Sequence, residues 1–352
     1  MKLFRSRKNN EATAVAERRP ESVEAEQLTE NGEYRAAIDL LAAANKSERD
    51  VELERQIRRV RHLAGIELMS SAPDSPSFPE ASSPAPAIDP VSKVPEVQPH
   101  ELTPEVLRAA ILQSGCLLVR GMMDPVKAEA LAQDIDHSFE VRKGLAPGEV
   151  DPDGFYEELQ PEDSHVIGER GWIEQGGGVL AADSPRMLFD MLDAFETANL
   201  PSVIEGYLGE TPALSAQKCT LRKATPDVKG AWHQDGKFLG DVRAMNVWLS
   251  LSRCGDVAPG MDIVPTRLEH FAQAGTDDAP LDYVISDAEV ARAAGDTGVV
   301  RPIFNPGDAL LFDDLFLHQT GSDDDMPNPR YAIESWFFGP SAFPDGYVPI
   351  AI

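Results

Sequence analysis

The sequence predicts a mainly β protein with flanking helices, in which a double-stranded β-helix (a cupin-like jelly roll) follows a small helical hairpin. Two observations support this fold class. Several segments before residue 200 space their apolar residues as helices do, whereas the chain after Thr211 is strand-like nearly to its end. The clearest strand, 244–252, alternates apolar and polar side chains. Helices followed by many antiparallel-looking strands are typical of packed sheets with helices on one side.

The first hundred residues are expected to lie outside the main domain. Residues 1–20 form a basic start that we expect to be disordered. Residues 21–68 have helical spacing on both sides of a glycine turn, which predicts a helical hairpin that resembles a single tetratricopeptide unit. Such a unit buries its apolar faces only by stacking, so it is a candidate contact for a protein partner or for self-association. The favoured alternative is a capping helix pair without a specific partner. Residues 69–100 contain eight prolines and predict a linker. The main domain is 101–352.

Within the main domain, a short helix near Glu101, one strand and two further helices precede the strand-rich part. The run 115–121 reads as a buried strand bounded by glycines. Asp124-Pro125 and Ser184-Pro185 each place a capping side chain before a proline, and amphipathic runs follow, so both predict helix starts. The segment 144–178 between them has no periodicity and is a candidate lid over a cleft.

Four later segments have the composition of strands, and turn residues such as Asn305-Pro306-Gly307 separate them. In the strand 244–252, Met245, Val247 and Leu249 should point to one side and Asn246 and Trp248 to the other. One face is therefore expected to pack and the other to line a site. The predicted strands are 215–222, 244–252, 308–313 and 330–338.

Composition narrows the classes of partner. The net charge of -27 and the pI near 4.5 disfavour nucleic acid and anionic membranes as partners, which leaves small molecules and proteins. Three scattered cysteines make neither a disulfide framework nor a zinc pattern, and they suit a reducing cytoplasm. The sequence shows no membrane span and no signal peptide core, so we expect a cytoplasmic protein.

Three side chains predict a metal site. His233 and Asp235 are two residues apart on extended chain, so they project to the same side. His318 lies 85 residues later, at the end of another strand-like run, where a jelly roll can return the chain to its starting point. Two histidines and one carboxylate occupy one face of an octahedron and leave three positions open, as in non-haem iron(II) oxygenases. Arg330 follows the second histidine by 12 residues, and its forked donors can clamp a carboxylate.

This order of residues resembles the phytanoyl-CoA dioxygenase family of iron(II)- and 2-oxoglutarate-dependent oxygenases. The resemblance covers about 101–340 and includes the turn Pro306-Gly307-Asp308. It implies that His233, Asp235 and His318 bind Fe(II) and that Arg330 pairs with the distal carboxylate of the cosubstrate. It further implies 2-oxoglutarate and O2 as cosubstrates, with hydroxylation of a small-molecule or carrier- or CoA-linked substrate and release of succinate and CO2.

Three more residues, Asn246, Gln217 and Trp248, match positions that often contact the cosubstrate or wall the cleft in this family. An alternative of equal weight is that these three are ordinary strand residues whose side chains contact only local partners. Alternatives for the whole protein are a noncatalytic jelly-roll scaffold that binds a partner through its N-terminal helices, a zinc hydrolase, and a nucleic-acid demethylase. A polyanionic substrate would need Arg222, Lys223, Lys229 and Lys237 to gather near the entrance, which the sequence leaves open.

Overall fold

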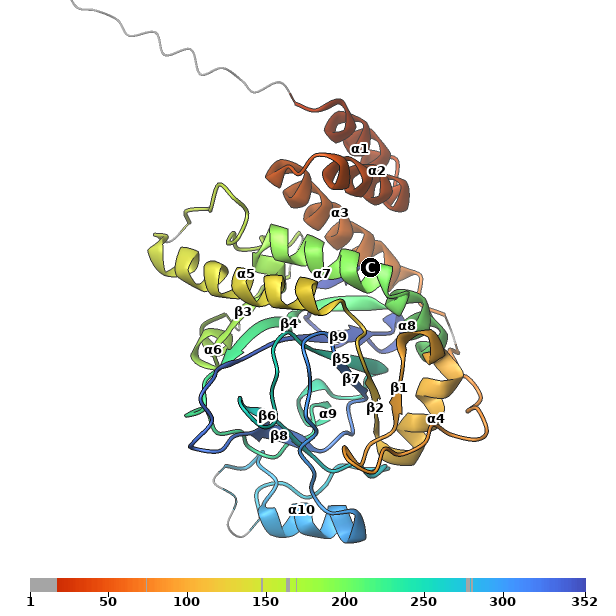
Figure 1. Cartoon of the computed structure of the whole chain (residues 1–352). Helices are drawn as coiled ribbons and strands as arrows, with labels where there is room; N and C mark the ends of the chain where they lie inside the picture. Colours follow the sequence, from red (N-terminus) through yellow and green to blue (C-terminus); the bar gives the residue numbers. More distant parts are fainter. Residues whose placement is uncertain are drawn as a thin grey trace, which may run out of the picture.

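The computed structural model describes residues 18–352 except for 74, 147, 163–164, 169, 277–278 and 280. Most of the expected basic start, 1–17, lies outside the described residues. The described chain forms a large sheet covered on one face by helices, a smaller sheet against its other face, and a stack of helices at the N-terminal end (Figure 1). None of its helices is both long enough and apolar enough to cross a membrane.

The large sheet has the strand order β1-β2-β7-β5-β9-β4-β10, and β3 pairs with β4 beside that path. The β1–β2 pair is parallel, and the other pairs are antiparallel. Its strands are β1 Glu96–Val97, β2 Cys116–Val119, β3 Gly178–Leu180, β4 Ala213–Ala224, β5 Ala244–Ser250, β7 Ala309–Phe312, β9 Arg330–Phe338 and β10 Pro349–Ala351. The second sheet pairs β6 Gly260–Ile263 with β8 His318–Gly321. The four predicted strands correspond to β4, β5, β7 and β9, while the jelly-roll assignment itself remains a prediction.

Alternation in the strands separates two apolar cores. On β5, Met245, Val247 and Leu249 pack under the helices. Trp248 faces the opposite way, into a second core between the large sheet and the β6–β8 pair. Because successive side chains of a strand point to opposite faces, the same strand contributes both to stability and to the cleft described below.

Helices cover the outer face of the large sheet. Asp124 and Ser184 cap α5 and α7 as predicted, each side chain accepting hydrogen bonds from backbone N–H groups of the first turn. The covering helices are α4 Pro104–Ser114, α5 Pro125–Gly144, α7 Pro185–Thr197 and α8 Leu200–Leu208. Shorter elements are α6 Arg170–Gln175, α9 Gly236–Leu239, α10 Asp287–Ala294 and the 3-10 turns η1 Pro99–Glu101, η2 Ala181–Asp183, η3 Gly295–Thr297 and η4 Pro340–Ala342.

The N-terminal segment forms three helices, and the expected pair was therefore too few. They are α1 Pro20–Glu30, α2 Tyr34–Ser47 and α3 Val51–Ser70. Their shared apolar cluster is distinct from the two main cores. The stack is nevertheless docked on the domain: His62 Nδ1 lies 3.0 Å from the carbonyl oxygen of Pro349, and Arg61 donates to the carbonyl oxygen of Ala351.

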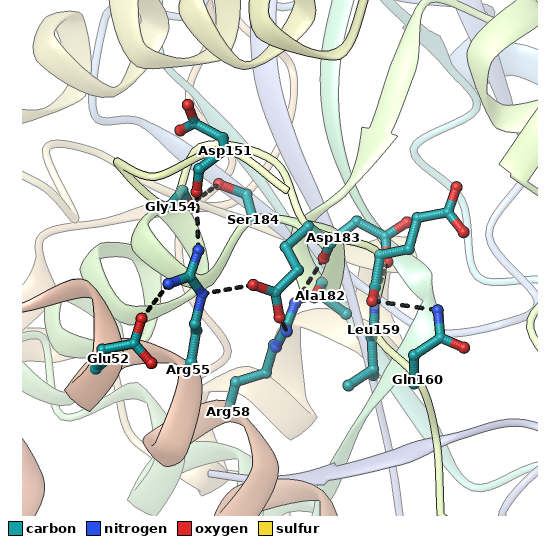
Figure 2. A network of polar contacts seen from close by, with 12 residues as sticks. Glu52, Arg55, Arg58, Asp151, Gly154, Leu159, Gln160, Ala182, Asp183 and Ser184 are labelled. Carbon is teal, nitrogen blue, oxygen red and sulfur yellow. Dashed lines mark hydrogen bonds and ion pairs between the residues drawn. The ribbon is translucent and has the colours of Figure 1, made fainter. Parts of the chain in front are cut away.

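Charged contacts extend this docking to the segment that leads into β3. Arg55 and Arg58 both pair with Glu157, and Arg58 also donates to the carbonyl oxygen of Ala182 at 2.9 Å (Figure 2). Arg55 donates to the carbonyl oxygen of Asp151 at 2.8 Å. The helices are thus bound to the main domain by buried and half-buried cations as well as by apolar packing.

The proline-rich segment does not behave as a free linker. Phe78 lies under the guanidinium groups of Arg108 and Arg243 and contacts the ring of Tyr207. Order also begins before residue 101, because β1 at 96–97 pairs with β2. The segment is bound along the surface at several points, since aromatic and backbone contacts offset its low apolar content.

Candidate metal centre

The two histidines of the predicted site face each other across a single antiparallel bridge. The N–H of His233 donates to the carbonyl oxygen of His318 at 3.1 Å, and the N–H of His318 donates back at 3.2 Å. Their imidazole centres are 4.5 Å apart. This pairing closes the gap of 85 residues between them and joins the chain before α9 to the start of β8.

Asp235 completes a cluster that is able to hold one metal ion. One ligand atom from each of His233, Asp235 and His318 lies within 4.8 Å of the others. Asp235 Oδ2 is 3.6 Å from His318 Nε2 and 4.0 Å from His233 Nε2. The next residue, Gly236, is closely packed, because a Cβ there would lie 2.5 Å from a carboxylate oxygen of Asp314 and that side chain would have to shift.

Backbone carbonyl groups orient both imidazoles. His233 Nδ1 is 2.7 Å from the carbonyl oxygen of Ala231, and His318 Nδ1 is 3.0 Å from that of Phe316. A carbonyl oxygen only accepts, so each Nδ1 carries the proton and each Nε2 presents its lone pair to the cluster. Burial, together with the neighbouring His233, lowers the pKa of His318 to about 4, which keeps its imidazole neutral as metal binding requires.

The cluster opens into a cleft of about 640 Å³ between the two sheets. This volume falls in the usual range for small-molecule sites. All seven residues predicted for the site line the cleft: His233, Asp235, His318, Arg330, Asn246, Gln217 and Trp248. The fold therefore brings residues from elements far apart in sequence to one cleft.

Arg330 is a buried cation with unused hydrogen-bonding capacity. It is 2% exposed, and its Nη1 donates to the carbonyl oxygen of Gly260 at 3.0 Å. Its Nε is buried without a hydrogen-bond partner in the described structure, and the guanidinium lies 5.4 Å from the Trp248 ring centre. Burial lowers the pKa of Arg330 from its ordinary value. A carboxylate in the cleft would satisfy this donor, so the residues present fit an acidic cosubstrate.

Asn246 and Gln217 differ in what they offer. Asn246 Oδ1 is buried without a hydrogen-bond partner among the described residues, which leaves one acceptor beside the cleft unsatisfied. Gln217 accepts from the N–H of Val348 at 2.8 Å and directs its amide nitrogen to the carbonyl oxygen of Gly346 at 3.4 Å. Its polar atoms are therefore engaged with the chain before β10. Gln217 is thus part of the cleft wall and is not available to bind a ligand through its amide.

The four basic residues that a polyanionic substrate would require at the cleft entrance do not all gather at the cleft. Arg222 and Lys229 line the cleft, whereas Lys223 and Lys237 do not. Arg222 is held by both carboxylate oxygens of Glu334, at 3.2 and 2.8 Å. Although burial opposes ionisation, Arg222 holds the pKa of Glu334 below its usual range.

The lining also includes residues that were not predicted for the site, among them Lys218, Glu334, Trp172, Phe238 and Tyr283. Glu334 could have been found, because it lies four residues after Arg330, on the same face of β9. The three aromatic residues come from α6, α9 and the loop before α10, and no local pattern relates them. The expected lid segment contributes α6 to this border.

Comparisons with known proteins do not assign a family. No protein family and no curated protein matches the chain. Solved structures that it resembles include EctD from S. alaskensis with 2-oxoglutarate and 5-hydroxyectoine, at 16% identity and a TM-score of 0.47, covering 76% of this chain and 88% of that one. Another is AviO1 from Streptomyces viridochromogenes Tue57, at 18% identity and 0.41, covering 66% and 94%. A third is the epimerase SnoN in complex with Fe3+, alpha ketoglutarate and nogalamycin RO, at 16% and 0.42, covering 68% and 84%.

Proposed function

We propose that the protein is an iron(II)- and 2-oxoglutarate-dependent oxygenase that oxidises a small molecule. One observation carries this proposal: three ligand atoms of the facial type converge in the lining of a cleft that also holds a buried arginine with an unpaired donor. The three ligands alone would also be compatible with a hydrolytic metal site, and the buried arginine alone would be compatible with a structural role. The ligands and the arginine in one cleft are what a metal that binds a keto acid requires.

In this proposal each residue has a defined task. His233, Asp235 and His318 hold the iron, and Arg330 binds the distal carboxylate of 2-oxoglutarate. When bound at these residues, iron would supply the oxidative decarboxylation of 2-oxoglutarate by O2 to succinate and CO2, in which one oxygen atom enters succinate and the other hydroxylates the substrate. Trp248 and the apolar wall of the cleft exclude water from the reacting atoms. Retention of Asp235 favours hydroxylation over halogenation, since the carboxylate occupies the position a halide would need. Membership of the phytanoyl-CoA dioxygenase family is part of the proposal.

The alternatives explain fewer observations. A zinc hydrolase would need a general base, yet Glu334, the acidic residue of the cleft besides Asp235, is engaged by Arg222. A noncatalytic scaffold would need no buried arginine with an unpaired donor beside three converging ligands. Its proposed partner surface is also reduced, because α3 is docked on β10 and on the domain.

Anaerobic loading tests the proposal. The full chain, given iron(II) and 2-oxoglutarate, should develop the weak visible charge-transfer band of a chelated keto acid. His318→Ala should abolish the band and the succinate formed on admitting air. His270→Ala is the matched control, because His270 is exposed and its side chain is not part of the cluster. A folded wild-type protein without the band would overturn the assignment.

A further inference from the structure

The proposed cosubstrate leaves three cations of the cleft unused, Lys218, Arg222 and Lys229, and among the described residues Lys218 is the one without a hydrogen-bonded acid. Lys218 lies on β4 next to Gln217, and both side chains line the cleft although neighbouring strand residues normally point to opposite faces. The register of β4 against β9 shifts between Leu214 and Cys219, which is a bulge-type irregularity. Such irregularities re-aim a side chain beside a site, and here the irregularity adds a lysine to the cleft wall.

Lys218 has a different environment from the other cations of the cleft. Arg222 is paired with Glu334, and Lys229 is paired with Asp324 at 2.8 Å. Within the described part of the chain, the acid nearest to Lys218 Nζ is Asp235, at 4.0 Å, and no hydrogen bond holds the ammonium. Its side chain is 23% exposed, so water screens it only in part.

Binding of iron(II) and 2-oxoglutarate would remove the charge compensation that Asp235 provides to Lys218. An iron(II) ion, the carboxylate of Asp235, a 2-oxoglutarate dianion and the Arg330 guanidinium together carry no net charge. The Arg222–Glu334 pair is also neutral. One positive charge, that of Lys218, therefore remains beside the metal, and a partly buried unpaired charge is unfavourable.

The border of the cleft adds an apolar requirement. Trp172, Phe238 and Tyr283 line it and are 69%, 48% and 43% exposed, and the rings of Phe238 and Tyr283 are 5.6 Å apart. Exposed aromatic side chains gathered at a cleft mark a surface that a ligand covers. The cleft thus combines an uncompensated lysine near the metal with aromatic rings farther out.

Building on the function proposed above, we infer that the substrate is a small monoanion, a carboxylate with an apolar or aromatic body, and that Lys218 binds its carboxylate. One residual charge matches one carboxylate. A coenzyme A thioester carries several negative charges, which a single lysine in a strongly acidic protein does not balance. Lys218 is in this view the residue that selects the charge of the substrate.

Matched probes test the inference on the full chain. With iron(II) and saturating 2-oxoglutarate under anaerobic conditions, the dissociation constants of 3-phenylpropanoate, its primary amide and its coenzyme A thioester are measured by calorimetry and tryptophan fluorescence, while the visible band is followed. We expect the acid to bind at least tenfold more tightly than the amide or the thioester, with the band retained. Lys218→Met should bring acid and amide within twofold of each other, and Lys218→Arg should restore most of the difference.

Lys223→Met is the matched control. Lys223 lies on the same strand but pairs with Asp136, outside the cleft, so the preference for the acid should be unchanged. The inference is overturned if the acid fails to bind, if the amide or the thioester binds as tightly, if the acid displaces the band, or if Lys218→Met weakens iron binding as much as it weakens acid binding. Failure of the wild-type band overturns the proposed function as well, whereas a normal band without charge preference overturns this inference alone.

Discussion

The buried guanidinium of Arg330 gives a prediction at the scale of one residue. It uses one donor on Gly260 and leaves Nε unpaired among the described residues, while Trp248 packs beside it. Arg330→Met should lower the affinity for 2-oxoglutarate by about tenfold to a hundredfold, because a charge-assisted hydrogen bond contributes about 1.5 to 3 kcal/mol. Anaerobic titration of the visible band measures this effect.

Arg330→Lys separates charge from geometry. Lysine keeps the positive charge but lacks the planar fork, so its affinity for 2-oxoglutarate should fall between those of the wild type and the methionine variant. Iron binding without 2-oxoglutarate should be unchanged in both variants, since Arg330 is not a ligand. Equal 2-oxoglutarate affinity in all three proteins would contradict the role assigned to Arg330.

Asp314 makes stability depend on pH. Burial, reinforced by Asp313, raises the pKa of its carboxyl from 3.8 to about 6. The folded state therefore holds a proton that the unfolded state has released, and the stabilisation present below about pH 4 is lost as pH rises to about 6.

In metal-free protein, Asp314→Asn should accordingly be more stable than the wild type at pH 8, by about 1 to 3 kcal/mol at most. The difference should shrink as the pH falls from 7 to 5. Urea denaturation at each pH provides the measurement, and a difference independent of pH would show that Asp314 titrates normally.

Residue types and spacing were sufficient to predict that His233, Asp235 and His318 cluster, because their approach depends on strand periodicity and on one return of the chain. The same reasoning missed Lys218, since the register shift in β4 breaks the period-two rule on which it depends. It also overestimated Gln217, whose amide is engaged by the backbone at 346–348, a contact set by tertiary structure.

At the scale of elements, the docking of α3 on β10 depends on one glycine. A Cβ at Gly65 would lie 2.7 Å from the carbonyl oxygen of Pro349 and 2.8 Å from its carbonyl carbon. Gly65→Ala should therefore destabilise the protein by about 1 to 3 kcal/mol through overpacking, although alanine favours a helix by about 1 kcal/mol in an open position. The free energy of unfolding in urea tests this directly.

Gly144→Ala is the matched control. Gly144 ends α5, and a Cβ built there meets no atom within 4 Å. Its substitution should be neutral or slightly stabilising. If the two alanine variants had the same stability, close packing of α3 against β10 would not be a source of stability.

Helix number was harder to predict than strand position. The break between α2 and α3 has neither glycine nor proline, and only the polar run 45–50 separates the apolar residues on its two sides. The available signal was Asp50, whose side chain accepts from the N–H of Glu52 and caps α3. A capping residue inside an apparently continuous helix is a weak local cue, so the third helix became evident only in the fold.

At the scale of the whole molecule, charged groups hold the N-terminal helices to the domain. Lys46 and Arg49 pair with Asp193 and Asp190 on α7, while Arg58 donates to carbonyl oxygens on both sides of β3, those of Glu157 and Ala182 (Figure 2). Composition alone could not show this, because a surface charge and a charge at a docking face look the same in sequence. The proline-rich segment was predicted to be a linker because the partners of Phe78, which are Arg108, Arg243 and Tyr207, lie far from it in the sequence.

Arg58→Met is the variant that tests this coupling. Arg58 is 5% exposed and serves Glu157 and two carbonyl oxygens, so its removal leaves buried acceptors unpaired and should cost about 2 to 4 kcal/mol. Arg59→Met removes the next arginine, whose side chain is 60% exposed and pairs with Glu162, and should cost less than about 1 kcal/mol.

Hydrogen exchange should accelerate in α1 to α3 and in 151–160 only for Arg58→Met, with the large sheet still protected. Uniform acceleration across the sheet would mean that the helices and the domain unfold as one unit, and unchanged exchange would mean that Arg58 does not couple them.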